Sequence, residues 1–258
     1  MTTKYDDEPV QIPAIMPMLP IRDLAIFPHM VIPLFIGRGP SIQSVEESIN
    51  QSNGLIFLTS QKESREESPN TDGVYRIGTV SLMMRVRKLI DGRIKILTQG
   101  LCKSEILEFT QTQPYFKVKI NQIQEFESNV NSKTKALIRN VREQLEKMKH
   151  LGKAFTSDIL AISESIIDPG RLAYLIASHL GLKINEAQDI LEIFDPIERL
   201  KKIHTILNRE IEILSMQVKI RSQAQDEMTK TQKEYFLREQ IRAIKNELGE
   251  IDPRGEDI

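Results

Sequence analysis

The pattern of apolar and polar positions changes at about residue 125 of this chain. Before that point, short β-prone apolar runs are separated by prolines and turn residues, and beyond it apolar residues recur at helical spacing. Short apolar runs bounded by turns indicate strands, and a 3.6-residue period indicates helices. We therefore predict an α+β fold, in which a β-rich N-terminal lobe with one short helix precedes a helical bundle that ends in a very long C-terminal helix.

The β-rich lobe is predicted over residues 13–124, after a polar, acidic lead at residues 1–12 that we expect to be disordered. Ser41 to about Asn50 carries apolar residues on one face and predicts the helix of this lobe. Prolines interrupt the first two strands, which places those strands at edges or bulges. The order of elements suggests a small, partly closed antiparallel barrel or split sheets. The predicted strands are Met16–Ile21, Met30–Ile36, Leu55–Thr59, 76–90, 93–99, Cys102–Phe109 and Tyr115–Ile123.

Asp91-Gly92 is the clearest local signal, because it lies between the two strand-like runs 76–90 and 93–99. Asp-Gly between strands is typical of a two-residue hairpin turn, which needs positive φ angles. We therefore predict a tight hairpin at this position.

The helical half begins with a polar linker at residues 125–135, followed by a bundle lobe at residues 136–210. Asp168 and Pro169 are expected to cap and start one helix, and Gly181 to end it. The helices of the bundle should pack on the first half of the long helix. The predicted bundle helices are Ala136–His150, Ser157–Ile167, Arg171–Leu180 and Asn185–Phe194.

The long helix is predicted over residues 195–248, because no glycine or proline occurs between Pro196 and Gly249. About 53 residues at 1.5 Å each give a rod of roughly 80 Å. The middle part, Lys219–Glu234, is poor in apolar residues and is expected to be solvated and to bend or fray in isolation. Residues 249–258 are expected to form a flexible tail. The stripe predicted to bury against the bundle is Leu200, Ile203, Leu207, Leu214 and Val218.

The composition of the chain argues against several classes of protein, namely general nucleic-acid binders, disulfide-bonded proteins and membrane proteins. The formal net charge of -1 gives no general attraction to nucleic acids or acidic membranes. Cys102 is the single cysteine, which excludes an internal disulfide and fits a reducing compartment. No apolar run approaches the ~20 residues that span a bilayer, and the N-terminus lacks a secretory pattern. We therefore expect a cytoplasmic protein without membrane contact.

Motifs for catalysis and metal binding are missing from the sequence. Gly152-Lys153 does not complete the phosphate-binding pattern G-x-x-x-x-G-K-[ST], and the four histidines have no partner at metal-ligand spacing. Basic residues gather around the predicted hairpin, where a solvated strand face is favoured over a nucleic-acid patch. These basic residues are Arg85, Arg87, Lys88 and Arg93.

Four sequence blocks together resemble the N-terminal region of the Lon ATP-dependent proteases. They occur in the family's order and cover about residues 13–250. The blocks are Leu19-Pro20-Ile21-Arg22-Asp23 with Phe27-Pro28-His29-Met30, Arg76-Ile77-Gly78-Thr79-Val80 with Gln99-Gly100-Leu101, Asp168-Pro169-Gly170-Arg171-Leu172-Ala173, and Lys233-Glu234-Tyr235-Phe236-Leu237-Arg238-Glu239-Gln240 with Glu247-Leu248-Gly249-Glu250.

The resemblance implies a lobe related to RNA-binding pseudobarrels, a helical lobe and a long helix that leads to an ATPase module. It also implies that the region captures unfolded or damaged proteins and helps subunits of the same protein to form a hexamer. ATP, magnesium, the P-loop and the Ser-Lys dyad of the parent serine protease would then belong to other parts of the enzyme. No catalytic, cofactor-binding or metal-binding residue is assigned in this chain.

Two groups of exposed apolar residues are candidates for contact with substrates or partner subunits. The first belongs to the Pro-interrupted strands, whose edges could accept an extended segment, and the second to the end of the long helix, where nothing in the chain can cover it. A nucleic-acid-binding pseudobarrel with weak DNA contact and a coiled-coil adaptor are the alternatives. The candidate contacts are Phe27, Met30, Phe35, Tyr235, Phe236, Leu237, Ile241, Ile244 and Leu248.

Overall fold

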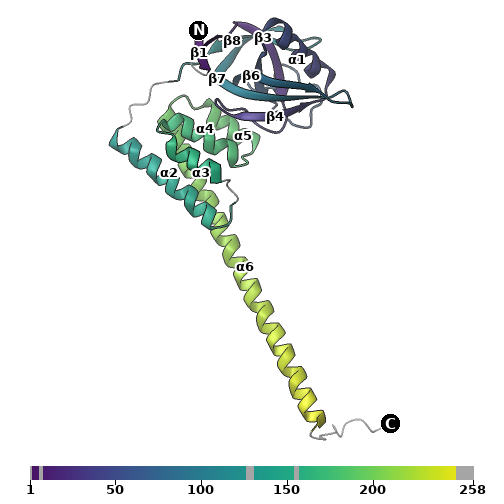
Figure 1. The fold of residues 1–258 in the computed structure, drawn as a ribbon, viewed down its shortest axis with the longest axis vertical. Helices are drawn as coiled ribbons and strands as arrows, with labels where there is room; N and C mark the ends of the chain where they lie inside the picture. Colours follow the sequence, from purple (N-terminus) through teal and green to yellow (C-terminus); the bar gives the residue numbers. More distant parts are fainter. Residues whose placement is uncertain (1, 6–7, 126–130, 154–156, 248–258) are drawn as a thin grey trace.

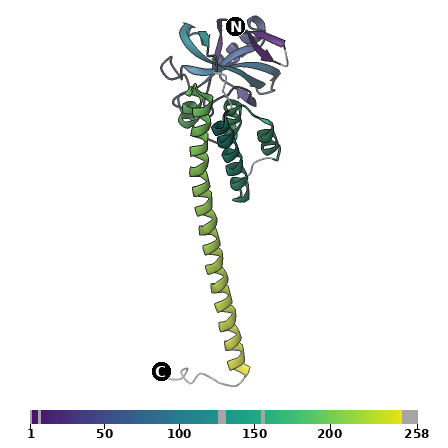
Figure 2. The same cartoon turned by 90° about the vertical axis from the view of Figure 1, so that its left-hand side faces the viewer.

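The computed structural model describes residues 2–5, 8–125, 131–153 and 157–247. A β lobe sits above a smaller α lobe, and one long helix leaves the α lobe as a rod (Figure 1). The view turned by 90° shows the start of this helix beside the other helices of the α lobe and the rest of it extending beyond both lobes (Figure 2). The predicted α+β architecture is confirmed.

The regular elements follow the predicted order. The strands are β1 (Thr2–Tyr5), β2 (Glu8–Gln11), β3 (Ile15–Ile21), β4 (Val31–Ile36), β5 (Leu55–Ser60), β6 (Ile77–Lys88), β7 (Ile94–Gln111) and β8 (Lys117–Gln122). The helices are α1 (Gly39–Gln51), α2 (Ser132–His150), α3 (Ser157–Ser165), α4 (Pro169–His179), α5 (Ile184–Glu192) and α6 (Pro196–Glu247).

The main sheet has the strand order β4-β7-β6-β5-β3-β8 and is closed by an additional pairing of β8 with β7. β4 pairs with the first part of β7 and β8 with its last part, so two predicted strands, 93–99 and Cys102–Phe109, are one long strand. Shifts of register in β6 and β7 bend this strand pair around the barrel. β4 is the edge strand of the sheet.

One expectation about the sheet is wrong, because the barrel is not purely antiparallel. β3 and β5 are parallel, and the chain between them crosses through β4 and α1. Parallel neighbours require such a crossover connection. β3 is also an internal strand and not an edge strand. Its first part, Ile15–Pro17, pairs with β8, and its second part, Met18–Ile21, pairs with β5. Each of its prolines therefore has one partner strand, which the missing N–H tolerates.

The predicted hairpin is present, but its loop has three residues instead of two. The amide of Leu89 donates to the carbonyl of Arg93 at 2.8 Å, and that of Gly92 donates to the carbonyl of Leu89 at 3.1 Å. Only Gly92 has a positive φ angle in this turn, +82°. A three-residue loop commonly combines a turn with one left-handed residue. Gly92 therefore adopts the positive φ angle that was predicted, whereas Asp91 does not.

Two expectations about the ends of the β lobe are corrected. The lead that we expected to be disordered contains β1 and β2, which pair antiparallel. Val10 and Ile12 pack against the barrel core, which explains why this segment is ordered. The linker is shorter than predicted, because Asn131 caps α2 by accepting a hydrogen bond from the Thr134 amide at 2.9 Å.

Aspartates cap two other helices, and the cap predicted at Asp168 is confirmed. Asp168 accepts from the Arg171 amide at 2.6 Å at the start of α4, and Asp195 accepts from the Ile197 amide at 2.7 Å at the start of α6. Gly181 follows α4 with a φ angle of +67°. These signals are local in sequence, so the residues that form them specify the helix ends directly.

α6 is a continuous helix of 52 residues, including the Lys219–Glu234 stretch where we expected a bend. Leu200, Ile203 and Leu207 are buried and Leu214 is half-buried against the α-lobe core, whereas Val218 is exposed, so the predicted buried stripe is too long by this one residue. Leu248 and residues 249–258 lie outside the described residues. No helix in the described part of the chain is both long and apolar enough to cross a bilayer.

Candidate functional site

The two lobes share one apolar core. Ala25 and Phe27 leave the β lobe and pack into the core of the α lobe, where the rings of Phe27 and Tyr174 lie 5.5 Å apart. Phe27 is only 2% exposed. It is therefore a structural contact between the lobes, and the proposal that it touches a substrate is withdrawn.

A buried group of charged and aromatic residues joins the lobes beside this core. Arg199 is fully buried, and its Nη2 lies 2.9 Å from Oε1 of Glu125. The guanidinium lies 4.0 Å from the ring centre of Tyr174, whose hydroxyl donates to Oε1 of Glu125 at 2.6 Å. Lys103 and Arg199 both donate to the carbonyl oxygen of Ile193 at 2.9 Å. We call Lys103, Glu125, Tyr174 and Arg199 the interlobe cluster.

Burial changes the protonation equilibria of the interlobe cluster. Removal from water, with a smaller contribution from the positive charge of Arg199, lowers the pKa of Lys103 to about 8, against the partial opposition of Glu125. Burial likewise raises the pKa of Tyr174 well above its usual value. Both shifts disfavour the charged form of a group that is taken out of water.

The low pKa of Lys103 predicts a stability that rises with pH. The unfolded chain holds the lysine proton up to its ordinary pKa of 10.5, whereas the folded chain releases it above about 8. The unfolded state thus binds more protons in this window, and the free energy of unfolding should increase by about 2 kcal/mol between pH 7 and 9.5. Urea unfolding of the native chain and of Lys103→Met at several pH values checks this, because only the native chain should show this increase. Parallel pH profiles of the two proteins would contradict it.

Two glycines of the β lobe, Gly78 and Gly100, allow neighbouring backbone segments to approach closely. A Cβ atom on Gly78 would lie 2.4 Å from the carbonyl oxygen of Leu58, and one on Gly100 would lie 2.3 Å from that of Phe27. Gly100 also exchanges backbone hydrogen bonds with the turn that carries His29 and Met30. His29 lies in this turn with a φ angle of +66°.

A pocket of about 280 Å³ opens between the lobes next to that turn. Met30 and Val31 line it from the β lobe, while Ile162 and Leu175 line it from α3 and α4. Met30, a predicted contact residue, is half-buried there. The pocket is walled by flexible and branched apolar side chains that an apolar group of another protein can contact.

The outer face of β4 continues this apolar lining along the edge of the sheet. Val31 is 52% exposed and Phe35 61% exposed, and Pro33 between them is exposed as well. Nζ of Lys95 on the neighbouring strand lies 5.1 Å from the ring centre of Phe35. We call Val31, Pro33 and Phe35 the β4 surface. It combines three exposed apolar side chains with a strand edge that pairs on one side only.

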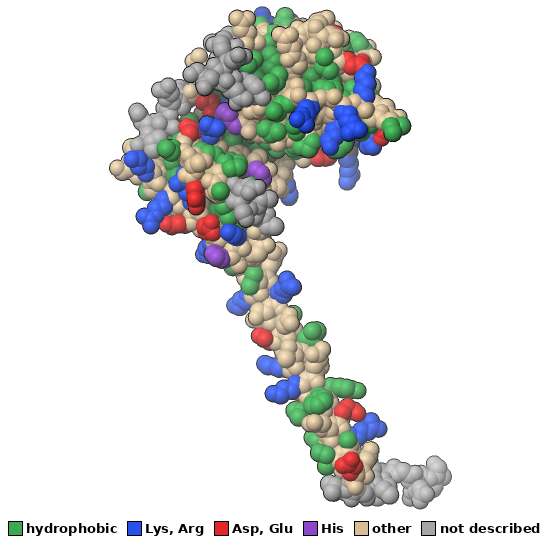
Figure 3. Space-filling model, in the orientation of Figure 1, with side chains coloured by type: hydrophobic (Ala, Val, Ile, Leu, Met, Phe, Trp, Pro, Cys, Tyr) green, Lys and Arg blue, Asp and Glu red, His purple; other side chains and the backbone are tan. Residues whose placement is uncertain are grey.

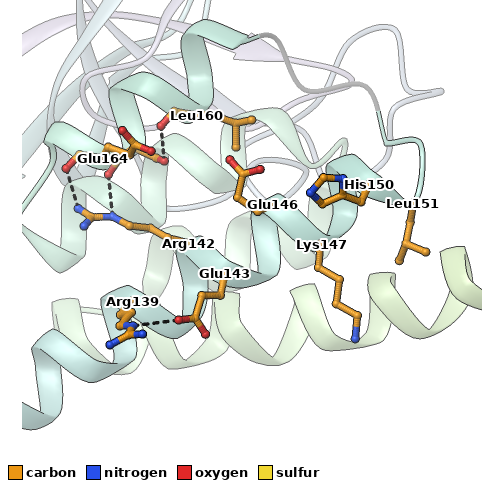
Figure 4. Close-up of a pocket in the computed structure, with 10 residues that line it drawn as sticks. Arg139, Arg142, Glu143, Glu146, Lys147, His150, Leu151, Leu160 and Glu164 are labelled. Carbon is orange, nitrogen blue, oxygen red and sulfur yellow. Dashed lines mark hydrogen bonds and ion pairs between the residues drawn. The ribbon is translucent and has the colours of Figure 1, made fainter.

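A second hollow, of about 500 Å³, lies between α2 and α3 and has a charged lining (Figure 4). Arg142 crosses it and donates to the carbonyl oxygens of Ser163 and Glu164 at 3.1 and 3.0 Å, which caps the end of α3. Arg139 pairs with Glu143 one turn away. Arg139 and Arg142 are therefore engaged within the lobe, while Leu151 and Leu160 add apolar side chains to the lining.

The predicted contacts at the end of α6 are exposed and lie far from the β4 surface (Figures 1 and 3). Figure 3 shows them as green side chains near the far end of the rod. The structure therefore forms two separate apolar surfaces instead of one site. The described residues of this second surface are Tyr235, Phe236, Leu237, Ile241 and Ile244. No cluster of metal-ligating side chains occurs in the described ranges.

Sequence reasoning did not identify the interlobe cluster. One signal was present, because Arg199 lies four residues before Ile203 on the buried face of α6. A charged residue on such a face requires a buried partner. The partners, Lys103 and Glu125, lie far away in the sequence and could not be found from spacing.

The architecture is that of the N-terminal domains of Lon proteases. The N-terminal domain of the Mycobacterium avium complex Lon protease superposes with a TM-score of 0.60 at 20% identity, covering 77% of this chain and 98% of that one. The Lon N-terminal domain protein from Xanthomonas campestris gives a TM-score of 0.53 at 12% identity, covering 73% and 96%. These identities establish the likeness of fold alone.

Sequence comparison identifies the family. The model described as the ATP-dependent protease La (LON) substrate-binding domain matches residues 15–209. The Lon protease of Geobacter metallireducens is 48% identical over 256 residues, covering 99% of this chain and 31% of the relative. Lon protease 2 of Bdellovibrio bacteriovorus is 49% identical over 255 residues, covering 98% and 32%. The chain belongs to the Lon protease family as its N-terminal substrate-binding domain, and it spans about a third of the length of these relatives.

Proposed function

We propose that this domain holds exposed apolar segments of unfolded or damaged proteins for a Lon-type ATP-dependent serine endopeptidase. The β4 surface is the observation that carries the proposal, because it presents Val31 and Phe35 to solvent beside the pocket between the lobes. An unfolded chain offers apolar side chains and free backbone groups. An edge strand with exposed apolar residues matches both.

Each copy of the domain binds a substrate weakly through the β4 surface, and several copies in one assembly together bind it more strongly. The apolar stripe at the end of α6 is proposed to contact other subunits in a hexamer of the whole enzyme. Several tethered copies raise the effective concentration of a captured chain without a tight single site. ATP hydrolysis, with its magnesium, and peptide cleavage are assigned to other parts of the cytoplasmic enzyme, because this sequence has no phosphate-binding loop motif.

The alternative of a nucleic-acid module receives less support. Of the basic residues around the hairpin, Lys88 pairs with Glu46 at 2.6 Å and Arg93 with Asp91 at 2.6 Å. These internal pairs reduce the charge available for phosphates. Weak DNA contact stays a prediction, and the absence of retardation of DNA by the domain at low salt would contradict it.

Polar substitution of the β4 surface should weaken binding of unfolded protein. In the double variant Val31→Ser/Phe35→Ser we expect the affinity for reduced, alkylated α-lactalbumin to fall about tenfold, because two partly exposed apolar side chains no longer contribute burial. Fluorescence anisotropy of the labelled probe measures the change. Both side chains are exposed, so thermal stability should be nearly unchanged.

Ile90→Ser provides the matched control. Ile90 is fully exposed at the tip of the β6–β7 hairpin and lies outside the β4 surface. Its replacement should leave the affinity within about twofold of the native chain, which corresponds to roughly 0.4 kcal/mol. Equal losses in the two variants would show that general hydrophobicity, and not the β4 surface, binds the probe.

A further inference from the structure

A groove with a volume of about 1190 Å³ lies entirely on the β lobe. Its walls come from the end of β3, the start of α1, the loop at residues 67–71 and the β7–β8 turn at residues 112–116. Four segments that are distant in sequence thus meet around one space. Its size corresponds to a ligand of several residues or a drug-sized molecule.

Two arginines with little compensating charge line this groove. Arg38 donates to the carbonyl oxygens of Glu67 and Pro20 and to Oε1 of Gln61, at 2.8, 3.3 and 2.7 Å, and none of these acceptors is a carboxylate. Arg22 has a buried Nε atom without a hydrogen-bond partner among the described residues. Burial and the charge of Arg22 lower the pKa of Arg38, so the two positive groups act on each other.

The start of α1 adds further donors to the same space. Gly39, Pro40 and Ser41 line the groove, and only Gly39 and Ser41 among them carry a backbone N–H, because proline has none. Arg38, the residue that precedes the helix, makes no side-chain cap. The first amides of a helix are unpaired donors with a partial positive charge. Glu67 is the single carboxylate of the described groove lining, and it is exposed. The groove is therefore built for a negatively charged group.

Rigid apolar residues form part of the remaining lining, between the polar residues Ser68, Asn70, Thr71, Thr112 and Gln113. Pro20, Pro69 and Pro114 line the walls together with Tyr115 and Phe116. Prolines and aromatic rings bind apolar side chains at low entropic cost because they have few torsions to fix. The lining thus offers apolar contacts next to a positively charged end.

The groove also begins close to the β4 surface. Phe35 and Arg38 are separated by two residues, so their Cα atoms are at most about 11 Å apart. An extended segment held on β4 can therefore reach the arginines within a few residues.

We propose that this groove binds the free C-terminal carboxylate of a protein substrate whose last residues are apolar. Arg22 and Arg38 would bind the carboxylate, and the proline and aromatic walls would contact the preceding side chains. A single carboxylate fits better than a polyphosphate, because the two arginines are the only cationic side chains in the described lining and the proline and aromatic side chains lie in the same groove. The inference rests on the proposed function, since it names the part of a protein substrate that this domain selects.

A pair of peptides tests the inference. One fluorescein-labelled peptide with three apolar residues at its end is made as the free acid and as the C-terminal amide. The native chain should bind the acid about tenfold more tightly, because a charge-assisted hydrogen bond contributes about 1.5–3 kcal/mol. Arg22→Gln should reduce this preference below about twofold, and Arg22→Lys should give an intermediate value. Arg139→Gln, on the exposed face of α2, should keep the full preference.

The outcomes separate this inference from the proposed function. Equal binding of acid and amide, or an unchanged preference in Arg22→Gln, overturns the carboxylate site while binding of unfolded α-lactalbumin can persist. Displacement of the acid peptide by micromolar inorganic phosphate would assign the groove to phosphate instead. Circular dichroism shows whether Arg22→Gln is folded. If it is not folded, the ratio of acid to amide affinity in Arg22→Lys tests the carboxylate site instead. Failure of the unfolded protein to bind at all would overturn the proposed function as well.

Discussion

Replacement of Arg199 by methionine is expected to lower the free energy of unfolding by about 3 kcal/mol. Methionine retains much of the volume but leaves Glu125 without the contact at 2.9 Å that now balances its charge. Removal of one partner of a buried ion pair costs about 3–5 kcal/mol, and the lower end applies because the Glu125 side chain is 32% exposed. Tyr174 also loses the guanidinium that lies against its ring. Urea unfolding at pH 7 measures the change.

Arg139→Met is the matched control for this experiment. Arg139 has an exposed side chain and pairs with Glu143 one turn along α2. Such surface pairs contribute only about 0.3–0.5 kcal/mol. If the Arg199 variant were as stable as this control, the interlobe cluster would not be what holds the lobes together.

Gly100→Ala is expected to destabilise the fold by at least about 3 kcal/mol, because the added methyl overlaps backbone that has no room to move. The new Cβ would lie 2.3 Å from the carbonyl oxygen of Phe27. That carbonyl belongs to a turn fixed by two backbone hydrogen bonds with Gly100 itself: the His29 amide donates to the Gly100 carbonyl at 2.8 Å, and the Gly100 amide donates to the Met30 carbonyl at 2.9 Å. A shift of the turn would also pull Phe27 away from Tyr174. Thermal and urea unfolding both report the loss.

Gly39→Ala tests whether the effect is specific to close packing. No atom lies within 4 Å of a Cβ built on Gly39, and its φ angle is not in the left-handed region. Its replacement in the first turn of α1 should change stability by less than about 0.5 kcal/mol. Similar losses at both positions would mean that the contact to Phe27 is relaxed easily.

Local features of the fold could be predicted because their signals lie within a few residues. Asp168 and Asp195 cap the helices that follow them, and Gly92 supplies the positive φ angle of the hairpin. The pairing of β3 with β5 could not be predicted, because parallel pairing depends on a crossover of more than thirty residues. The double pairing of β8 is likewise a property of the closed barrel and leaves no local pattern.

The candidate contacts differ in exposure, and their role as contacts stays a prediction. Phe35 and Phe27 both lie in apolar runs near prolines, yet one is exposed on β4 and the other is buried between the lobes. Hydrophobicity identifies residues that avoid water, and only the packing of the second lobe decides which ones are covered. The proposed carboxylate groove was missed for a similar reason, since Arg22 and Arg38 converge only after the sheet has formed.

The α lobe holds α6 from Pro196 to Ile211, so the rest of the helix projects from that anchor as a lever. Over the length of about 54 Å from Ile211 to Glu247, a tilt of about 10° displaces the far end by about 9 Å, which is close to the width of a helix. Changes in packing near Ile211 are thereby amplified at Tyr235 and Ile244.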